Sequence, residues 1–593
     1  MCGIFGYIGK RSNAAEIVFE GLKRLEYRGY DSWGIATKQE TRNRKLETGK
    51  LLVEKHVGKI SNSDSSLATC HSSLALGHTR WATHGGVTRV NAHPHVDCSG
   101  TIAVVHNGII ENWQELKKNL RKKHRFVSET DTEVVVHMIE EDVKEIPLRI
   151  AVRKVFNKLS GLNAVVVLAN GELIAAKNGS PLVVGIGKNE YFIASDAAAI
   201  LPHTKKVIFL RDYQMVSVNT YGVKVFDLAT GGEIKPKIEI LDWKLQEAEL
   251  GKFTHFMLKE IYEQPKVLRN IAENSTDEIT GLCKLIKKAH GTFFIGAGTA
   301  YHACLAGVYL FSKIAKEHVN TTVASEFNYL EDFLGKDSLV IALSQSGETI
   351  DVVEPLKKAK EEGVMIVGIV NNQGSTIWQM ADYKLLLGVG PEIAVASTKA
   401  YIAKLAILLL TVYGLRGKLT EGRKLLFAAA DEVERILFEE SRDLKKIAKV
   451  LAGHDHVFTI GRGLSYQTAL EAALKIKEVS YVHAEGLAGG ELKHGPIALI
   501  SKGTPCIVFA PNDETYGPII SNATEIKARG GLIIGVSPVN ESVFDYWIRV
   551  KDLGAASVIP NVVPSQLFGY YLALELGLDP DRPRNLAKSV TVK

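Results

Sequence analysis

Up to about residue 235, hydrophobic positions gather in short runs rich in Val and Ile, which Gly, Asn and Asp residues separate. Apolar residues at helical spacing predict two amphipathic helices, at Ala14–Leu25 and Thr132–Glu140. The order of elements favours an α+β domain built on antiparallel sheets. Its predicted strands include Thr101–Val105, Ala164–Ala169, Tyr191–Ala194, Lys206–Leu210 and Gln214–Val218.

The pattern changes after Gly231-Gly232 and the charged segment Asp242–Glu249. From about residue 281, an apolar run, a loop containing Gly or Ser and a helical stretch follow one another several times. This order is typical of doubly wound α/β domains. We therefore expect an N-terminal domain over 2–235, a linker and helical connection over 236–280, two α/β domains over 281–425 and 450–582, and a tail over 583–593.

The second part of the chain repeats itself. Three landmarks recur in the same order with offsets of 165, 166 and 167 positions, pairing Gly296 with Gly461, Glu348 with Glu514 and Gly368 with Gly535. Chance similarity among apolar strands is the alternative, but it would not preserve order and spacing together. The pattern predicts two copies of one fold, at about 281–420 and 450–580.

The composition of the 593 residues is that of an ordinary globular protein, with a formal net charge of only +6 and scattered basic residues. It gives no indication of a nucleic acid or a membrane as partner. The six cysteines lie far apart, which argues against a disulfide framework and a structural zinc site. No apolar run approaches the roughly 18–20 residues that span a bilayer, and the N-terminal segment lacks the order of a signal peptide. We expect a soluble, cytoplasmic protein.

Cys2 directly follows the initiator Met1. Removal of Met1 would leave a cysteine whose own α-amino group, with a pKa of about 7.7–8.0, can accept the thiol proton. Such a nucleophile attacks an amide. A lone cysteine at this position is more often an ordinary residue, so the hypothesis depends on the polar groups that follow it.

Those polar groups match the two ends of glutamine. An Arg fork can hold an α-carboxylate, an Asp can hold an α-ammonium group, and an Asn amide with a Gly N–H can receive an oxyanion. The residues that supply these groups are Arg80, Asp131, Asn107 and Gly108. The nearby histidines His78, His84, His93 and His95 suggest a metal as the alternative, but they lack the spacings of known metal motifs, and we expect no metal and no cofactor.

The loop Ser344-Gln-Ser-Gly-Glu-Thr349 lies between a predicted strand and a predicted helix. Hydroxyls and free N–H groups at a helix N-terminus form an anion site, so a phosphate would fit there. An ordinary capped turn is an equally good explanation of this loop alone. The equivalent loop of the second copy, 510–515, contains Pro511 and Asp513, which disfavour an anion, so we place the phosphate in the first copy.

Glu471, Lys475 and Glu478 share one face of a predicted helix at about Thr468–Glu478. Such a face can tune a carboxylate or an amine for proton transfer if it is enclosed, although a solvated row of ion pairs is the more common outcome. His494 follows in a loop and could act as an acid or base. In the C-terminal tail, Lys588 matters only if the tail folds over a site, where a buried amine of lowered pKa could form an imine with a keto sugar.

The sequence closely resembles the isomerizing glutamine–fructose-6-phosphate aminotransferases, the glucosamine-6-phosphate synthase family, almost end to end. The motifs that carry the resemblance are Cys2-Gly-Ile, Leu25–Ser32, His78–His84, Asn91–His95, His106–Asn112, Lys259–Pro265, Ser344–Thr349, Ala396–Ala400, Glu491–Pro496 and Arg584–Val592. The N-terminal motifs are shared with other amidotransferases that use an N-terminal nucleophile. The C-terminal ones point to sugar isomerase (SIS) domains and a ketose phosphate.

The resemblance implies an N-terminal-nucleophile (Ntn) glutaminase domain followed by two SIS domains. It implies that ammonia from L-glutamine passes through an internal channel to D-fructose 6-phosphate, giving D-glucosamine 6-phosphate and L-glutamate, the first step of amino sugar biosynthesis. It also implies a homodimer whose sugar sites combine residues of both chains, so that His494 could serve the partner's site.

The resemblance also assigns roles to residues. Cys2 is implied as the nucleophile, Asn107 and Gly108 as the oxyanion hole, and Trp81 as the channel gate. Glu478 would move a proton between the first two sugar carbons, His494 with Lys475 nearby would assist ring opening, and Lys588 would form the imine. The implied substrate-binding residues are Arg80, Trp81, Thr83, His84, Asp131, Thr299, Ser344, Gln345, Ser346, Thr349, Val395 and Ala587.

One loop departs from the family pattern. Many members have a cysteine where this chain has Ala297 and a serine where it has Ala300. Loss of the serine would remove a hydroxyl that contacts phosphate, so we expect weaker sugar-phosphate binding, or compensation by Thr299 and backbone donors. Two alternatives remain: a sugar-phosphate-binding regulator, which leaves Cys2 and Lys588 unexplained, and a glutamine-dependent enzyme that acts on another keto sugar phosphate.

Overall fold

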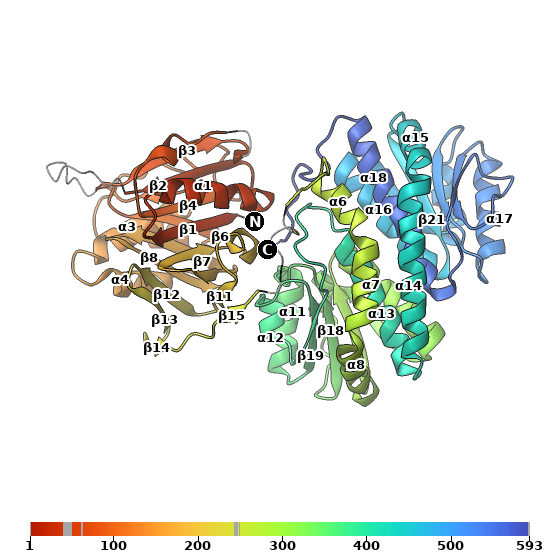
Figure 1. The fold of residues 1–593 in the computed structure, drawn as a ribbon, viewed down its shortest axis with the longest axis horizontal. Helices are drawn as coiled ribbons and strands as arrows, with labels where there is room; N and C mark the ends of the chain where they lie inside the picture. Colours follow the sequence, from red (N-terminus) through yellow and green to blue (C-terminus); the bar gives the residue numbers. More distant parts are fainter. Residues whose placement is uncertain are drawn as a thin grey trace. The chain divides into compact units, whose positions relative to one another are not determined.

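The computed structural model describes residues 2–38, 50–60, 63–241, 243, 247 and 249–590. Met1, most of the charged segment 242–249 and the last three residues of the tail lie outside the described residues. The chain forms two compact units. One comprises Met1–Ala248 with the short pieces Gly374–Thr376 and Ser589–Lys593, and the other comprises Glu249–Gln373 and Ile377–Lys588 (Figure 1).

The first unit contains two antiparallel sheets. The strands of one sheet are β1 Gly3–Gly9, β2 Ser32–Thr37, β3 Leu52–Val57, β4 Leu74–Arg80, β9 Val183–Ile186, β10 Glu190–Ala194, β11 Lys206–Phe209 and β15 Glu239–Ile240. Their spatial order is β15-β11-β9-β10-β1-β4-β2-β3. Cys2 therefore stands at the beginning of a central strand.

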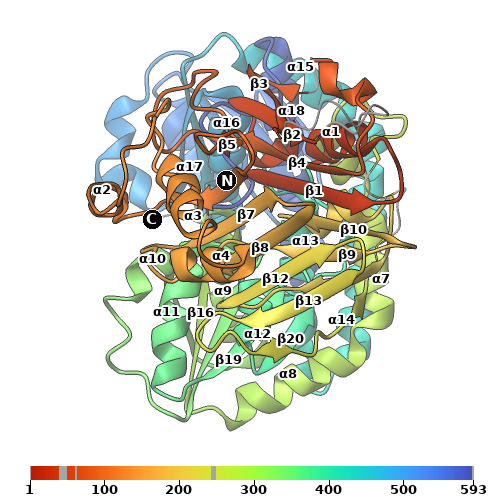
Figure 2. The same cartoon turned by 90° about the vertical axis from the view of Figure 1, so that its left-hand side faces the viewer.

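The strands of the other sheet are β5 His95–Val96, β6 Ala103–Gly108, β7 Asn163–Ala169, β8 Glu172–Asn178, β12 Gln214–Asn219, β13 Gly222–Asp227 and β14 Glu233–Ile234. Their order is β14-β13-β12-β8-β7-β6-β5, and the neighbouring strands β13, β12, β8 and β7 are clear in Figure 2. Asn107 and Gly108 end β6, so they lie at the edge where this strand stops.

Helices cover the outer faces of the two sheets. The helices of this unit are α1 Ala14–Leu25, α2 Trp113–Lys118, α3 Glu133–Asp142, α4 Leu148–Phe156 and α5 Ala197–Ile200. Side chains of β1 alternate between two cores: Ile4 and Ile8 pack with residues of the other sheet, whereas Phe5 and Tyr7 pack with α1. The helices α3 and α4 cover the outer face of the second sheet (Figure 2). The predicted antiparallel α+β domain is confirmed as four layers, helix, sheet, sheet and helix.

The second unit contains two parallel sheets of five strands. One has β16 Gly291–Gly296, β17 Val319–Val323, β18 Ser338–Leu343, β19 Met365–Val370 and β20 Tyr383–Leu386, in the order β17-β16-β18-β19-β20. The other has β21 His456–Gly461, β22 His483–Ala488, β23 Pro505–Phe509, β24 Leu532–Ser537 and β25 Tyr546–Arg549, in the order β22-β21-β23-β24-β25. The two orders are the same, position by position, which confirms the repeat predicted from the sequence.

Helices pack on both faces of each parallel sheet, as in doubly wound folds. They are α6 Phe256–Tyr262, α7 Gln264–Asn274, α8 Thr276–Lys288, α9 Thr299–Leu310, α10 Ala324–Phe327, α11 Ile350–Glu361, α12 Thr376–Met380, α13 Lys399–Leu415, α14 Leu419–Arg435, α15 Ser441–Leu451, α16 Tyr466–Ser480, α17 Tyr516–Lys527 and α18 Val563–Glu575. One large core includes residues of both sheets and of α13, α16 and α18. In Figure 1, α7 and α14 run side by side along this core.

The longest apolar helix of the described residues is α13, whose 17 residues are almost all buried. Its apolar character serves the shared core, because Tyr401, Leu405 and Leu409 are all inaccessible to solvent. Within the described ranges, no helix combines the length and the apolar character needed to cross a membrane.

Candidate functional site

The first candidate site surrounds Cys2. Its Sγ lies 3.3 Å from the backbone nitrogen of Trp81, which donates to it, and 3.6 Å from the carbonyl oxygen of the same residue. Burial raises the pKa of the Cys2 thiol, although the Trp81 N–H and the charge of Arg80 act in the opposite direction. A base close to the sulfur is therefore needed to form the thiolate.

Asn107 is fixed next to Cys2. Its Nδ2 donates to the carbonyl oxygen of Cys2 at 3.1 Å and to Ser195 Oγ at 2.9 Å, and its Oδ1 lies 3.1 Å from His78 Nε2. The structure thus brings the predicted oxyanion donor to the nucleophile. In this conformation both Nδ2 hydrogens already have acceptors, so one of these contacts must break before the amide can stabilise an oxyanion. The sequence analysis did not identify Ser195, which no motif distinguishes from other serines.

Gly108 follows Asn107 with a φ of 131°. A Cβ at this position would lie 2.2 Å from the carbonyl oxygen of Leu162. Only glycine therefore fits at this position, directly after Asn107.

The predicted glutamine clamp is built around Arg80, at the end of β4. Its Nη1 donates to the carbonyl oxygen of Gly86 at 3.1 Å, and its Nη2 to those of His84 at 2.5 Å and Gly85 at 2.9 Å. The buried guanidinium thus shapes the turn 84–86. Thr83 is exposed at the start of this turn, and His84 packs edge-on against Trp113.

Asp131, the predicted ammonium acceptor, is buried just before α3. Its Oδ2 accepts from the backbone nitrogen of Ile110 at 2.7 Å, two residues after Gly108. The negative charge also acts on Arg80. Cys2, Asn107, Gly108, Arg80 and Asp131 therefore gather in one region, while the gating role of Trp81 stays a prediction.

The histidines of this region pack together behind Asn107. The rings of His78 and His93 stack with centroids 4.3 Å apart, and His95 meets His93 edge-on at 4.7 Å. Burial lowers the pKa of His78 to about 3 and those of His93 and His95 well below the usual value, so these rings are neutral. They act as hydrogen-bonding supports of the site: His78 Nε2 contacts the carbonyl oxygen of His106 at 3.0 Å and Asn107 at 3.1 Å.

The second candidate site lies in the other unit, at the carboxyl ends of β16 and β18. After β16 the chain forms β17, which pairs with one edge of β16, and then β18, which pairs with the opposite edge. Ligands of doubly wound sheets bind at such a switch point. Thr299 follows β16 as the first residue of α9, and the loop 344–349 connects β18 to α11.

The loop 344–349 has the geometry of an anion site. Gly347, with a φ of 69°, donates from its nitrogen to Ser344 Oγ at 3.0 Å, and the Glu348 nitrogen donates to Ser346 Oγ at 3.1 Å. Ser344 Oγ and Thr349 Oγ1 lie 3.4 Å apart. Gln345 belongs to the same loop, which stands before the N-terminus of a 12-residue helix. Hydroxyls and the helix dipole here favour a phosphate.

The equivalent loop of the second copy is satisfied by its own carboxylate. Asp513 Oδ1 accepts from the nitrogen of Thr515 at 2.8 Å and from its hydroxyl at 2.6 Å. The Asp513 charge occupies the place that an anion would take and would repel a phosphate. This geometry supports placing the phosphate in the first copy.

The charged face of α16 is enclosed. Glu471 and Lys475 have no solvent-exposed side-chain surface, while the side chain of Glu478 is 23% exposed. Lys475 Nζ contacts Glu478 Oε2, lies 3.4 Å from Glu471 Oε1 and donates to Thr299 Oγ1 at 3.1 Å. Burial opposes the charge on Lys475, but the two carboxylates outweigh it and raise the pKa of this amine. The alternative, a row of solvated ion pairs on this helix face, is therefore wrong. The hydrogen bond from Lys475 to Thr299 joins the face to the switch point.

The C-terminal tail folds back onto this unit. The Val395 nitrogen donates to the carbonyl oxygen of Asp581 at 3.0 Å, and the Arg584 nitrogen donates to Tyr481 Oη at 2.6 Å. Lys588 Nζ then reaches Glu392 Oε2 at 2.6 Å and the carbonyl oxygen of Ala394 at 2.7 Å. Its side chain is only 4% exposed. The tail thus places Lys588, and with it the preceding Ala587, beside the predicted Val395.

Glu392 is a functional candidate that the sequence analysis missed. Its Oε1 accepts from the nitrogens of Thr398 and Ala400, both at 3.0 Å, at the start of α13. Burial disfavours the charge, yet Lys588 and the Ala400 N–H lower the pKa of Glu392 to about 2. Its position just before the Ala396–Ala400 motif was the available signal, but its role depends on Lys588, which is distant in the sequence.

A second buried carboxyl group lies close to the same ion pair. Glu260 Oε1 accepts from the nitrogens of Ile393 at 2.5 Å and Ala394 at 3.2 Å. Burial raises the pKa of Glu260 to about 8, although the charge of Lys588 acts in the opposite direction. A carboxyl group that is neutral at neutral pH can donate its proton once the charge of Lys588 changes, and the carboxylate so formed can take a proton back.

His494 is not brought into this network. It lies exposed in the short 3-10 helix Glu491–His494. Among the described residues, no hydrogen bond or ion pair joins it to Lys475, Glu478 or Lys588. Its predicted role in ring opening therefore has no support within a single chain.

The comparison with known proteins decides the family. A glutamine--fructose-6-phosphate aminotransferase [isomerizing] from Pyrococcus horikoshii is 45% identical over 613 residues, covering 100% of both chains. The chain belongs to this aminotransferase family. The enzyme of the same name from Aquifex aeolicus is 42% identical over 607 residues, again covering 100% of both chains.

Domain comparisons agree with the two units. A glutamine amidotransferase domain matches residues 44–224, and a SIS domain matches residues 285–413 and 450–545. The solved C-terminal domain of glucosamine-fructose-6-phosphate aminotransferase from Francisella tularensis is 32% identical, with a TM-score of 0.51, and covers 56% of this chain and 99% of that chain. The predicted glutaminase domain followed by two SIS domains is confirmed as the fold class of this family member.

The ion pair of Glu392 generates a prediction about stability. Because its pKa is about 2 in the folded chain and 4.5 ordinarily, this carboxylate stabilises the fold fully above about pH 4.5, and the contribution is lost as the pH falls toward 2. Glu392→Gln is expected to lower the urea midpoint of unfolding at neutral pH. The difference from wild type should shrink as the pH falls through this window.

The matched control is Glu361→Gln, at the exposed end of α11. It should leave the urea midpoint unchanged at each pH. A Glu392→Gln variant as stable as wild type at neutral pH would contradict the assigned ion pair.

The alanine at position 300 generates a second prediction. Ala300 is buried in the first turn of α9, beside Thr299. A serine there would add one hydroxyl at the switch point, worth about 0.5–1.5 kcal/mol, or about a 2- to 13-fold lower KM for fructose 6-phosphate. Steady-state kinetics of Ala300→Ser measure this effect, with the exposed Ala528→Ser as control. An unchanged KM would show that a hydroxyl at position 300 does not contribute to sugar-phosphate binding.

Proposed function

We propose that the chain converts L-glutamine and D-fructose 6-phosphate to L-glutamate and D-glucosamine 6-phosphate. The observation that supports this most directly is the position of Lys588, whose buried amine contacts Glu392 and whose charge acts on Glu260, in the unit that also carries the loop 344–349. A regulator that only binds a sugar phosphate has no use for such an amine. The family membership and the Cys2 site in the other unit support glutamine as the nitrogen donor.

The glutaminase half would begin with removal of Met1. The free α-amino group of Cys2 then takes the thiol proton, and the thiolate attacks the carboxamide carbon of glutamine. Asn107 and Gly108 stabilise the oxyanion, while Arg80 and Asp131 hold the carboxylate and ammonium groups of the substrate, with Thr83 and His84 beside them. Ammonia leaves, and water hydrolyses the thioester to release glutamate.

The sugar half would use the second unit. Ser344, Gln345, Ser346, Thr349 and the first turn of α9 at Thr299 hold the phosphate. Lys588 gives up its proton to the adjacent Glu392 carboxylate and attacks the keto carbon, and the keto oxygen leaves as water as the imine forms. Ammonia displaces Lys588 from the imine, and Glu478 moves a proton from the first to the second sugar carbon.

We further propose that the chain works in the cytoplasm as a homodimer. Its six cysteines are free thiols, which suits a reducing compartment. The exposed position of His494, apart from Lys475 and Glu478, supports a site that is completed by a second copy of the chain.

The nucleophile can be tested by Cys2→Ala. The variant is expected to lose glutamate release from glutamine by several orders of magnitude, because no other group can form the thioester. Cys70→Ala, which removes a half-buried thiol of the same unit, should keep full activity. Mass spectrometry of the wild type should show that Met1 is absent; a fully active protein that retains Met1 would contradict the mechanism.

The division of labour can be tested by Lys588→Ala. Sugar amination should fall below detection, while glutamine hydrolysis continues, since Cys2 belongs to the other unit. The exposed Lys502→Ala is the matched control and should retain both activities. Continued production of glucosamine 6-phosphate by a folded Lys588→Ala variant would exclude the imine.

A further inference from the structure

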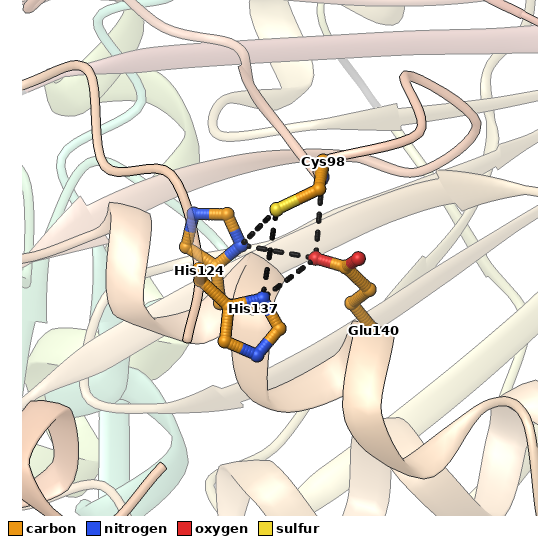
Figure 3. A group of neighbouring side chains, drawn as sticks. All are labelled: Cys98, His124, His137 and Glu140. Carbon is orange, nitrogen blue, oxygen red and sulfur yellow. Dashed lines mark hydrogen bonds and ion pairs between the residues drawn. The ribbon is translucent and has the colours of Figure 1, made fainter. Parts of the chain in front are cut away.

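Four side chains of the first unit, none of them part of the Cys2 site, point toward one common centre (Figure 3). Cys98 lies in the turn between β5 and β6, His124 in the connection between α2 and α3, and His137 with Glu140 on α3 itself. One donor atom from each residue lies within 4.8 Å of the other three. This set is separate from His78, His93 and His95, which the sequence analysis considered.

We propose that Cys98, His124, His137 and Glu140 bind one structural zinc ion. A thiolate, two imidazoles and a carboxylate are the ligand types that zinc takes, and four protein ligands close a tetrahedral site. The ligand charges suit the metal as well, because one thiolate and one carboxylate balance the two positive charges of Zn²⁺ while both imidazoles stay neutral.

Four of the six distances between donor atoms fit a tetrahedral centre, and the other two are within 4.8 Å. Zn–S and Zn–N bonds of ordinary length place sulfur and nitrogen about 3.6 Å apart, and nitrogen and oxygen about 3.4 Å apart. Cys98 Sγ lies 3.6 Å from His124 Nδ1 and 3.8 Å from His137 Nδ1. Glu140 Oε2 lies 3.0 Å and 3.1 Å from the same two nitrogens. All four separations are within a few tenths of an ångström of the requirement.

The second nitrogens of the two rings also fit. His124 Nε2 lies 3.1 Å from Glu141 Oε1, and His137 Nε2 faces Glu133 Oε1 at 3.9 Å. Histidines that bind zinc commonly direct their other nitrogen to a carboxylate, which fixes the ring and its tautomer. Here both rings turn Nδ1 toward the centre and Nε2 toward a glutamate.

A network of hydrogen bonds without metal explains the same contacts less well. Glu140 Oε2 would have to accept from both rings as well as from the Cys98 nitrogen, and His137 Nε2 is buried without a hydrogen-bond partner among the described residues. The two ring centroids are only 4.7 Å apart, and the side chains are 4% and 1% exposed. A metal at the common centre lets both rings bind through Nδ1 as neutral ligands.

The surroundings hold the ligands in place and leave a path for entry. Asp97 Oδ1 accepts from the nitrogens of Thr101 and Ile102, both at 2.7 Å, which fixes the turn that carries Cys98. His137 and Glu140 are three residues apart on α3, so they share a helix face. Cys98 is exposed, so an ion can reach the centre from solvent.

The site would anchor residues 119–132, which connect α2 to α3 and form no helix or strand. His124 stands in the middle of this connection. A zinc ion would join it to α3 and to the β5–β6 turn at once, and so stabilise the fold of the unit by binding only its folded form.

The test uses the full-length protein, stripped with a chelator and titrated with Zn²⁺. The wild type should bind one zinc ion per chain, measured by elemental analysis after dialysis, and its thermal midpoint should rise. Co²⁺ in place of zinc should give the visible absorption of a tetrahedral site with a thiolate ligand. The expected stoichiometry falls to zero in Cys98→Ser and His137→Gln.

Two features keep the test decisive. Cys98→Ser changes an exposed side chain and should fold, so it remains informative if His137→Gln does not. Cys70→Ser is the matched control and should bind zinc as the wild type does. A wild type that takes up no zinc, or a Cys98→Ser variant that binds it with unchanged stoichiometry and the same cobalt spectrum, would overturn the proposal.

Discussion

Charge that is withdrawn from water must be compensated, and this constraint organises the second unit. Glu392 cannot stay ionised inside the unit without Lys588 and the N–H groups at the start of α13. Because Lys588 belongs to the tail, the carboxylate determines where the last part of the chain folds. Burial also lowers the pKa of the nearby Lys404 to about 8, although Glu392 and Glu471 act in the opposite direction, so the charges around the tail and those of α16 belong to one buried network.

The two copies of the sheet differ in the loop at the switch point. Both copies have the same strand order and therefore the same kind of switch point. In the first, the hydroxyls of Ser344 and Ser346 accept from the N–H groups of the two residues before Thr349 and α11. In the second, Asp513 performs the capping itself. The same fold thus carries two differently capped loops, and the buried charges of α16 in the second copy reach the first copy through Thr299.

The sequence predicts the fold well because its signals are local. The helix at Ala14–Leu25 has the predicted bounds, and the strands around Val166 and Val216 follow runs of β-branched residues. Much of the site follows from the resemblance, which assigned Asn107 and Lys588 their roles. What remained hidden depends on long-range contacts: Ser195 behind Asn107, Glu392 opposite Lys588, and the four residues around Cys98. A glutamate three positions after a histidine, as in His137 and Glu140, is too common to indicate a metal alone.

The contacts of Asn107 and Arg80 have a consequence for the resting enzyme. Both groups already donate to acceptors of the chain itself, Asn107 to the carbonyl of Cys2 and to Ser195, and Arg80 to the turn 84–86. In the proposed glutaminase reaction the substrate replaces these acceptors, so part of its binding energy goes into rearrangement and its apparent affinity falls by the same amount.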